Sequence, residues 1–350
     1  MERKINKSKL AAQIQRTINM PVKKKREYDG DMGRVISTGS TLLDLAISGG
    51  RIRGGGLPLG ILVEIFGPSG CGKTVLLSEI AGAVQRSGGD LTFFDPEARL
   101  NQQFARIFGL DTTKLDYKQP STVTELFQAV RAWEPRSKKD INGIFADSLA
   151  ALSTDLEIDN KDGDKMGMRR AKEFSEELRK TCRVLANEGY LMVCSNQVRV
   201  NVDAGIYGQK YTTPGGESVG FYSSLRLQAR KPSEIKVKEK VAGKEISRTI
   251  GVQSEIRVFK SSIWKPYRTA SISILFDYGI DDIRENLQFI KDYTKNTMYT
   301  LGGEKLAVSL DNSIMMVEER NAEKELKEEV IDLWEMIESK FEVDRKPKQR

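Results

Sequence analysis

Short hydrophobic runs alternate with stretches of helical periodicity through the first two-thirds of the chain. Apolar and β-branched residues cluster, in the manner of buried strands, at residues 61–66, 91–94, 141–145 and 191–193. The intervening residues 74–83 and 122–133 have apolar positions at the spacing of amphipathic helices. Because strands that alternate with helices build a largely parallel sheet, we predict an α/β fold with its active groups at the carboxyl ends of the strands.

The pattern changes after residue 225. Alternating segments at 255–259 and 271–276 accompany a Lys-rich stretch, 231–248, that contains Ala242-Gly243. This pattern predicts antiparallel hairpins at one edge of the sheet. Beyond residue 279 we expect a smaller unit with a turn at 299–303 and a closing helix. The apolar positions of that helix are Leu326, Val330, Leu333, Ile337 and Phe341.

A chain of 350 residues is larger than a single hydrophobic core usually supports. We therefore predict an N-terminal arm (1–34), a large α/β core (35–280), a small α+β C-terminal domain (281–343) and a frayed tail (344–350). In the arm, Leu10, Ile14 and Ile18 have the spacing of a short amphipathic helix. This helix either packs on a neighbouring subunit, as an oligomerisation helix, or packs back on its own domain.

Composition and charge exclude several classes of function. The chain has no histidine, which rules out histidine-based triads and histidine metal ligands, and its three cysteines have no zinc-type spacing. No apolar run is long enough to span a membrane, so we expect a cytoplasmic protein. The net charge is +7, and residues 1–34 hold ten Lys/Arg against four Asp/Glu. Such an arm is typical of polyanion binding, or equally of a solvated linker.

The strongest motif is a phosphate-binding loop between a predicted strand and a predicted helix. It reads Gly67-Pro68-Ser69-Gly70-Cys71-Gly72-Lys73-Thr74, followed by Val75, and fits G-x-x-x-x-G-K-[ST]. Backbone N–H groups of such a loop surround the phosphates, Lys73 supplies a cation, and the Thr74 hydroxyl can bind Mg²⁺. A Gly-rich turn without this role leaves Lys73 unexplained. Cys71, close to a helix N-terminus, is either a reactive thiol of lowered pKa or an inert loop residue.

Carboxylate and amide side chains follow three other predicted strands. Asp147 follows 141–145 and is placed to hold Mg²⁺ through water, although a carboxylate there also occurs as a helix cap. Glu97 lies just beyond 91–94 and is a candidate for activating water. Asn196 and Gln197 end a further strand, and Gln197 is a candidate γ-phosphate sensor. The alternative for Glu97 and Gln197 is a loop residue without a catalytic role.

Several segments in order resemble the bacterial RecA recombinase family. The likeness extends over about residues 36–280 and is looser in the C-terminal unit. Its segments are Ile36-Ser37-Thr38-Gly39-Ser40 with Leu43-Asp44, the phosphate loop, Asp95-Pro96-Glu97-Ala98, residues 146–152, Asn196-Gln197-Val198-Arg199, Thr212-Thr213-Pro214-Gly215-Gly216 with Phe221-Tyr222, and residues 263–268.

The resemblance implies a RecA-type P-loop ATPase core that uses ATP and Mg²⁺. It implies that Glu97 is the catalytic carboxylate, that Gln197 switches between nucleotide and DNA, and that Asn101 and Phe104 lie near adenine. Two DNA-binding loops are implied at about 157–168 and 198–215. Their implied DNA-binding residues are Met166, Gly167, Met168, Arg169, Arg170, Arg199, Val200, Tyr207, Gly208, Thr213, Gly215 and Gly216.

The family also places two lysines of a neighbouring subunit near the γ-phosphate. Lys260 matches the first, but Ser262 stands at the second position, and Lys265 lies three residues further on. Ser69 replaces an acidic residue of the phosphate loop, residues 51–56 form an Arg/Gly insertion, and the last residues given are basic where the resemblance leads us to expect an acidic tail. These departures indicate a divergent member, of the kind that phages or plasmids carry.

The resemblance implies an ATP-dependent strand-exchange protein. A helical filament would hold single-stranded DNA for pairing with homologous duplex DNA, in recombination, DNA repair and the SOS response to damage. The alternative is a motor or regulatory ATPase of the same fold that acts on a protein partner or branched DNA, because the phosphate loop alone does not separate the two. A small-molecule kinase is a third possibility, for which the sequence shows no acceptor pocket.

Overall fold

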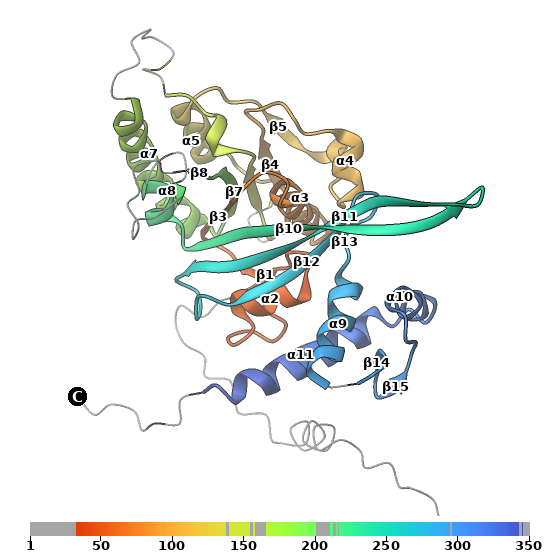
Figure 1. Ribbon diagram of the computed structural model, residues 1–350. Helices are drawn as coiled ribbons and strands as arrows, with labels where there is room; N and C mark the ends of the chain where they lie inside the picture. Colours follow the sequence, from red (N-terminus) through yellow and green to blue (C-terminus); the bar gives the residue numbers. More distant parts are fainter. Residues whose placement is uncertain are drawn as a thin grey trace, which may run out of the picture.

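A sheet of nine strands forms the centre of the molecule (Figure 1). The computed structural model describes residues 33–137, 140–154, 157, 166–200, 211–212, 215, 217–294, 296–342 and 345. Within them the strand order is β13-β12-β11-β10-β3-β7-β6-β4-β5. The predicted α/β fold with a mostly parallel sheet is confirmed.

The parallel half of the sheet carries the predicted buried strands. They are β3 (Leu62–Gly67), β7 (Leu191–Gln197), β6 (Gly143–Ala146), β4 (Leu91–Phe94) and β5 (Asp116–Lys118). β7 continues four residues beyond the predicted run. The polar side chains of Ser195 and Asn196 are buried there because they hydrogen-bond to Asp147 and Glu64, so their burial leaves no unpaired polar group.

Helices cover both faces of this parallel half. On one face α3 (Lys73–Arg86) packs Leu76, Leu77 and Ile80 into a core that extends under the antiparallel strands. On the other face lie α5 (Val123–Ala132) and α7 (Met166–Glu188), whose aromatic rings Phe127 and Phe174 meet edge to face at 6.1 Å. The shorter elements are α4 (Gln102–Ile107), η1 (Thr112–Lys114), η2 (Leu149–Ala151), α8 (Glu217–Tyr222), β8 (Arg199–Val200) and β9 (Tyr211–Thr212).

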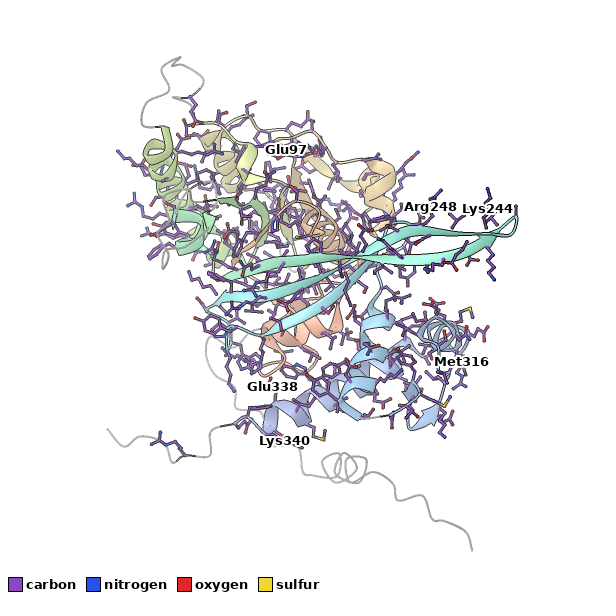
Figure 2. The ribbon with its side chains drawn as sticks, in the orientation of Figure 1. Glu97, Lys244, Arg248, Met316, Glu338 and Lys340 are labelled. Carbon is purple, nitrogen blue, oxygen red and sulfur yellow. The ribbon has the colours of Figure 1, made fainter. Side chains whose placement is uncertain are left out.

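The antiparallel half contains the hairpin that the sequence predicts. Its strands are β10 (Leu225–Val241), β11 (Lys244–Ser261), β12 (Thr269–Leu275) and β13 (Gly279–Ile280). Ala242 and Gly243 form the turn with φ of 51° and 80°, the left-handed geometry of two-residue hairpin loops. The distal part of β10 and β11 projects from the body as a two-stranded ribbon, with Lys244 and Arg248 near its tip (Figures 1 and 2).

A smaller unit follows β13 and has its own apolar core. It comprises α9 (Asp282–Thr294), β14 (Thr300–Leu301), β15 (Glu304–Lys305), α10 (Leu310–Glu319) and α11 (Glu323–Ser339). Leu326, Val330 and Leu333 are buried as predicted, but Phe341 lies beyond the end of α11 and is 72% exposed. The prediction for Phe341 is therefore wrong, because the helix ends before its spacing can bring that ring onto the core.

Side-chain contacts attach this unit to the core. The N-terminal elements of the core are β1 (Val35–Ile36), α2 (Thr41–Ser48) and β2 (Leu57–Pro58). Thr41 donates its backbone N–H (2.7 Å) and its hydroxyl (2.6 Å) to the carboxylate of Asp282, and the rings of Trp264 and Trp334 lie 5.6 Å apart. Arg53, from the Arg/Gly insertion, forms ion pairs with three acidic residues of α11, which are Glu328, Asp332 and Glu335.

The predicted amphipathic helix with Leu10, Ile14 and Ile18 lies outside the described residues, as does nearly all of the predicted tail. The domain boundaries stay predictions. No helix in the described part of the chain has the length and apolar character that crossing a bilayer requires.

Candidate active site

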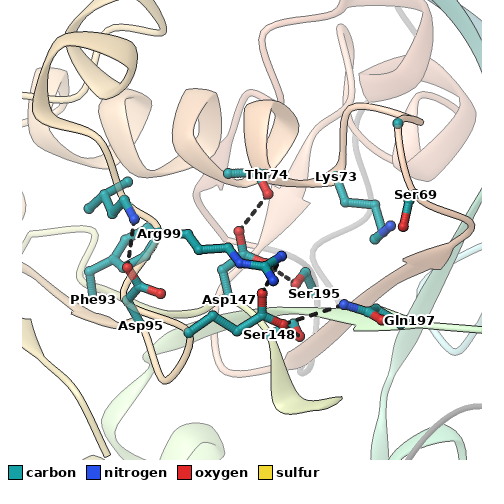
Figure 3. A pocket seen from close by; sticks show the side chains of 13 residues that line it. Ser69, Lys73, Thr74, Phe93, Asp95, Arg99, Asp147, Ser148, Ser195 and Gln197 are labelled. Atoms are coloured by element: carbon teal, nitrogen blue, oxygen red, sulfur yellow. Dashed lines mark hydrogen bonds and ion pairs between the residues drawn. The ribbon is translucent and has the colours of Figure 1, made fainter. Parts of the chain in front are cut away.

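A polar cavity of about 200 Å³ lies where the carboxyl ends of β3, β4, β6 and β7 meet (Figure 3). This is the sheet edge at which the sequence predicts the active groups. The cavity is lined by Ser69, Gly70, Lys73, Thr74, Phe93, Asp95, Glu97, Arg99, Leu100, Asp147, Ser148, Ser195 and Gln197.

The phosphate loop connects β3 to α3 and forms one wall of the cavity. Gly70 and Gly72 both have φ of 76°, and a Cβ atom on Gly72 would lie 2.2 Å from Cδ1 of Ile274. The positive φ and the close approach of Ile274 both favour glycine at Gly72. The α3 N-terminus has no side-chain cap, which leaves its N–H groups available to an anion.

Lys73 points back at its own loop. Its ammonium donates to the carbonyl oxygens of Gly67 (3.0 Å) and Pro68 (2.7 Å). Burial lowers the pKa of Lys73, and the nearby acidic groups oppose that shift. A phosphate group in the loop would exchange these neutral carbonyl contacts for a charge-assisted contact, so the lysine is placed to respond to a polyphosphate.

Asp147 lies opposite the loop and accepts two hydrogen bonds from hydroxyl groups. Thr74 Oγ1 donates to Oδ2 at 2.6 Å, and Ser195 Oγ donates to Oδ1. Burial raises the pKa of Asp147, while these two hydrogen bonds act against the increase. A hydroxyl and a carboxylate are hard oxygen ligands of the type Mg²⁺ prefers, so Thr74 and Asp147 fit the predicted magnesium site. The cap residue of η2 is Ser148, so the alternative role of Asp147 as a helix cap is not observed.

Glu97 and Gln197 meet across the cavity, although a hundred residues separate them. Glu97 Oε1 accepts from the amide of Gln197 (3.4 Å) and from the hydroxyl of Ser148 (3.1 Å), whereas Oε2 forms an ion pair with Arg99 at 2.6 Å (Figure 3). The Glu97 side chain is 16% exposed, so water can reach the carboxylate. The arrangement connects a carboxylate that could orient water to an amide at the tip of the neighbouring strand.

Asp95, Arg99 and Ser195 belong to the cavity but were not singled out from the sequence. Asp95 is 2% exposed and accepts from the backbone N–H of Leu100 (2.7 Å) and the hydroxyl of Tyr117 (2.9 Å). It thereby holds the loop that carries Glu97. Position was the available signal, since Asp95 and Ser195 both lie at the carboxyl ends of strands.

Two predicted nucleotide-site residues face the core instead of the cavity. Cys71 is 1% exposed and Val75 is 7% exposed, and both belong to the core cluster beside α3. Burial raises the pKa of the Cys71 thiol, with Lys73 opposing the shift, which argues against the alternative of a reactive thiol of lowered pKa. Desolvation outweighs the helix N-terminus here, and Cys71 fits the alternative of an inert loop residue.

The implied adenine residues lie at the start of α4. The carbonyl of Asn101 accepts the first backbone hydrogen bond of α4, from Ala105, and its neighbour Leu100 lines the cavity, but Asn101 itself does not. The side chain of Phe104 is outside the described residues.

Lys260 lies away from the cavity of its own chain. Its ammonium donates to the carbonyl oxygens of Gly220 (2.9 Å) and Phe221 (2.8 Å) at the end of α8. Ser262 donates its backbone N–H to Ser224, and the Lys265 ammonium lies 5.6 Å from the centre of the Trp264 ring.

Few of the implied DNA-binding residues lie within the described part of the chain. Arg170 donates to the carbonyl of Ala150 at 2.9 Å, and Gly215 is buried with φ of 89°. The backbone of β8, Arg199–Val200, pairs with β9. The side chains of Met166, Met168, Arg169, Arg199 and Val200, and the whole of Tyr207, Gly208, Thr213 and Gly216, lie outside the described residues.

Comparison with known proteins agrees with the predicted RecA-type core. A model of the RecA N-terminal domain matches residues 11–281. The chain belongs to the RecA family. Protein RecA of Anaplasma marginale (strain Florida) is 32% identical over 307 residues, which cover 86% of this chain and 81% of that protein. Protein RecA of Wolbachia pipientis subsp. Culex pipiens (strain wPip) is 35% identical over 250 residues, which cover 71% of this chain and 66% of that protein.

The RecA match includes every element that borders the cavity and ends just after β13. The resemblance inferred from the ordered motifs is thus confirmed at the level of the family, together with the RecA-type core. The roles assigned to individual residues remain predictions.

Proposed function

We propose that the protein is an ATP-dependent DNA recombinase, a DNA-dependent ATPase that forms a helical filament on single-stranded DNA and pairs it with homologous duplex DNA. The contact between Glu97 and Gln197 carries this proposal, because it joins the proposed catalytic carboxylate to the residue that immediately precedes the predicted second DNA loop. Membership of the RecA family supports it.

ATP is proposed to bind with its phosphates in the loop at residues 67–74. Lys73 would leave the carbonyls of Gly67 and Pro68 and contact the phosphates. Thr74 would hold Mg²⁺ directly and Asp147 would do so through water. Bound Mg²⁺ supplies charge neutralisation for the transferred phosphoryl group. Asn101 and Phe104 are proposed to border the adenine.

Glu97 is proposed to orient the attacking water, since the chain has no histidine for this task. Ser148 and Arg99 fix the direction of its two carboxylate oxygens. Gln197 shares Oε1 of Glu97, so a γ-phosphate that attracts the Gln197 amide would shift the strand tip before residues 198–216. ATP would in this way alter the DNA-binding segment.

DNA binding is proposed for the two loops named above and for Arg170 beside the first of them. Lys260 is proposed to act in a neighbouring subunit of the filament, because in its own chain it lies at the end of α8 and not in the cavity. We also propose that the protein works in the cytoplasm. Binding of this type neutralises phosphates, so the affinity for single-stranded DNA should fall steeply with salt.

The test is ATP hydrolysis by the purified protein with Mg²⁺, with and without single-stranded DNA. Lys73→Ala should lose hydrolysis while retaining the melting temperature of the wild type. Lys305→Ala, which changes an exposed lysine of β15, is the matched control and should behave as wild type. Strong stimulation by DNA supports the recombinase. A rate of ATP hydrolysis that DNA does not change would instead favour a motor or regulatory ATPase with a protein partner.

A further inference from the structure

A chain of polar contacts crosses the sheet from β10 to β7 through the buried carboxylate of Glu64. Glu64 lies in the middle of β3 and its side chain is 0% exposed. Arg226 Nε of β10 donates to Oε2 at 2.5 Å, and Asn196 Nδ2 of β7 donates to Oε1 at 2.9 Å. Each oxygen of one rigid carboxylate is therefore attached to a different neighbouring strand.

On the β7 side, this series of contacts ends at the cavity described above. Asn196 is fully buried, and its side-chain oxygen accepts from the backbone N–H of Gln197 at 3.0 Å. The amide of Asn196 can satisfy both contacts in one orientation only, with nitrogen towards Glu64 and oxygen towards Gln197. Glu64 thus determines how the backbone is held at Gln197.

The β10 side ends beneath α8. The Arg226 guanidinium lies 4.4 Å from the Phe66 ring centre and 5.4 Å from that of Phe259, and it is close to α8. A Cβ atom on Gly220 would lie 2.7 Å from Arg226 Nη1. Lys260 holds the carbonyl end of the same helix. Burial lowers the pKa of Lys260, and the charge of Arg226 adds to that decrease.

These two ends bracket residues 198–216. Gln197 immediately precedes that segment and α8 immediately follows it. We propose that Glu64 is a positioning residue that couples the two ends of this segment, holding Gln197 through Asn196 and the α8 end through Arg226. The inference rests on the proposed function, since it assumes that residues 198–216 bind DNA.

Coupling of this kind follows from the cost of a buried charge. A carboxylate without a partner in the interior is strongly unfavourable, so Glu64 and Arg226 must keep their contact when either strand moves. A shift of α8, or movement of Lys260 to an anion of another subunit, would act on Arg226 and then on Gln197. Movement of Gln197 towards a γ-phosphate would act in the opposite direction, since coupling between two sites is reciprocal.

The experiment measures how much ATP changes DNA affinity. The Kd for fluorescent oligo-dT is determined by anisotropy without nucleotide and with a slowly hydrolysed ATP analogue, and their ratio is the coupling factor. We expect a factor of about 10 or more in the wild type, within the usual range for coupled sites. Glu64→Gln, which keeps the shape but removes the charge, should reduce it to about 2 or less.

Glu177→Gln is the matched control. Glu177 is also a largely buried acid, and it forms ion pairs with Arg131 and Lys180. It lies on α7, away from the contacts that Glu64 makes with Arg226 and Asn196. The control should keep the coupling factor of the wild type. A purely structural role of Glu64 would weaken DNA binding in both states equally and leave the ratio unchanged, which would overturn the proposal. Equal loss in Glu177→Gln would overturn it as well.

Arg226→Gln provides a second test from the β10 side, at a position with 16% of the side chain exposed, and an unchanged melting temperature would show that it folds. It should lose the coupling factor to the same extent, and an unchanged factor would contradict the coupling. A wild type without any coupling would refute the proposed function and, with it, this inference. A coupled wild type with unaffected variants would refute the inference alone.

Discussion

Ser195 offers a sharp test of the charge balance in the active site. Its hydroxyl is buried and donates to Oδ1 of Asp147, while Thr74 donates to the other oxygen. Ser195→Ala removes one of these two bonds and little volume. Because the hydrogen bond stabilises the ionised carboxylate, its loss should increase the pKa of Asp147 beyond the value that burial has already raised.

The size of the increase follows from the two protonation states. A hydrogen bond to a charged group contributes about 1.5–3 kcal/mol, and one between neutral groups about 0.5–1.5 kcal/mol. When Ser195 is replaced by Ala, the ionised form of Asp147 therefore loses about 1–1.5 kcal/mol more stabilisation than the protonated form. Since 1.36 kcal/mol corresponds to one pKa unit, the pKa should rise by about one.

The assay is the pH profile of kcat/KM for ATP hydrolysis at saturating Mg²⁺. The proposed magnesium role of Asp147 requires the ionised carboxylate, so the acid limb of Ser195→Ala should move up by about one pH unit, with activity approaching that of the wild type at higher pH. Ser254→Ala is the control, because Ser254 is equally buried and its hydroxyl has no hydrogen-bond partner in the described part of the chain. An unmoved acid limb, or a uniform loss at every pH, would refute the reasoning.

Three further predictions concern individual side chains. Glu97→Gln should bind ATP as the wild type does but hydrolyse it at least about 100-fold more slowly, and weakened binding of a fluorescent ATP analogue would contradict its role. Burial raises the pKa of Asp44 to about 6 from 3.8, so its contribution to stability is present below pH 3.8 and is lost as the pH rises through about 6. When the free energy of unfolding is measured in urea at several pH values, Asp44→Asn should remove up to about 3 kcal/mol of its change with pH. If the free energy of unfolding of the variant changed with pH as that of the wild type does, this role of Asp44 would be refuted. Cys71 should react slowly with iodoacetamide at pH 7.5 with or without ATP, because burial raises the pKa of its thiol. Rapid labelling that ATP prevents would contradict this and favour the alternative that Cys71 is a reactive thiol.

Much of the fold could be predicted because most of the buried strands are short, nearly continuous runs of apolar residues. The apolar runs at β3 and β4 coincide with the strands, and the phosphate loop begins where β3 ends. Ala242-Gly243 was recognisable because few residue pairs tolerate the left-handed turn. Glu97 and Gln197 could each be selected because they follow predicted strands, but their contact could not be predicted, since nothing local indicates that strands β4 and β7 bring them together.

The features that could not be predicted depend on contacts between residues that are distant in the sequence. Glu64 interrupts an apolar run, and only the contacts with Arg226 and Asn196 explain its burial. That Asn196 and Gln197 end a strand was predicted, but the burial of Ser195 and Asn196 there was missed for the same reason. The two alternatives for Cys71 could not be separated from the sequence, because a helix N-terminus is visible there, whereas the desolvation that raises the thiol pKa depends on packing.

The projecting hairpin has a consequence for self-association. In the described part of the chain, β10 pairs with β3 only as far as Gln228, and β11 pairs with β12 only from Gly251 onwards. Both outer edges of the ribbon are thus open to strand addition by another molecule. Lys236 and Lys238, 56% and 67% exposed, form ion pairs with Glu234 and Glu245, and residues 231–248 still hold six Lys/Arg against three Glu, so two such edges would bring net positive charge together. This excess of positive charge disfavours edge-to-edge pairing of two hairpins when many copies of the chain are held close together.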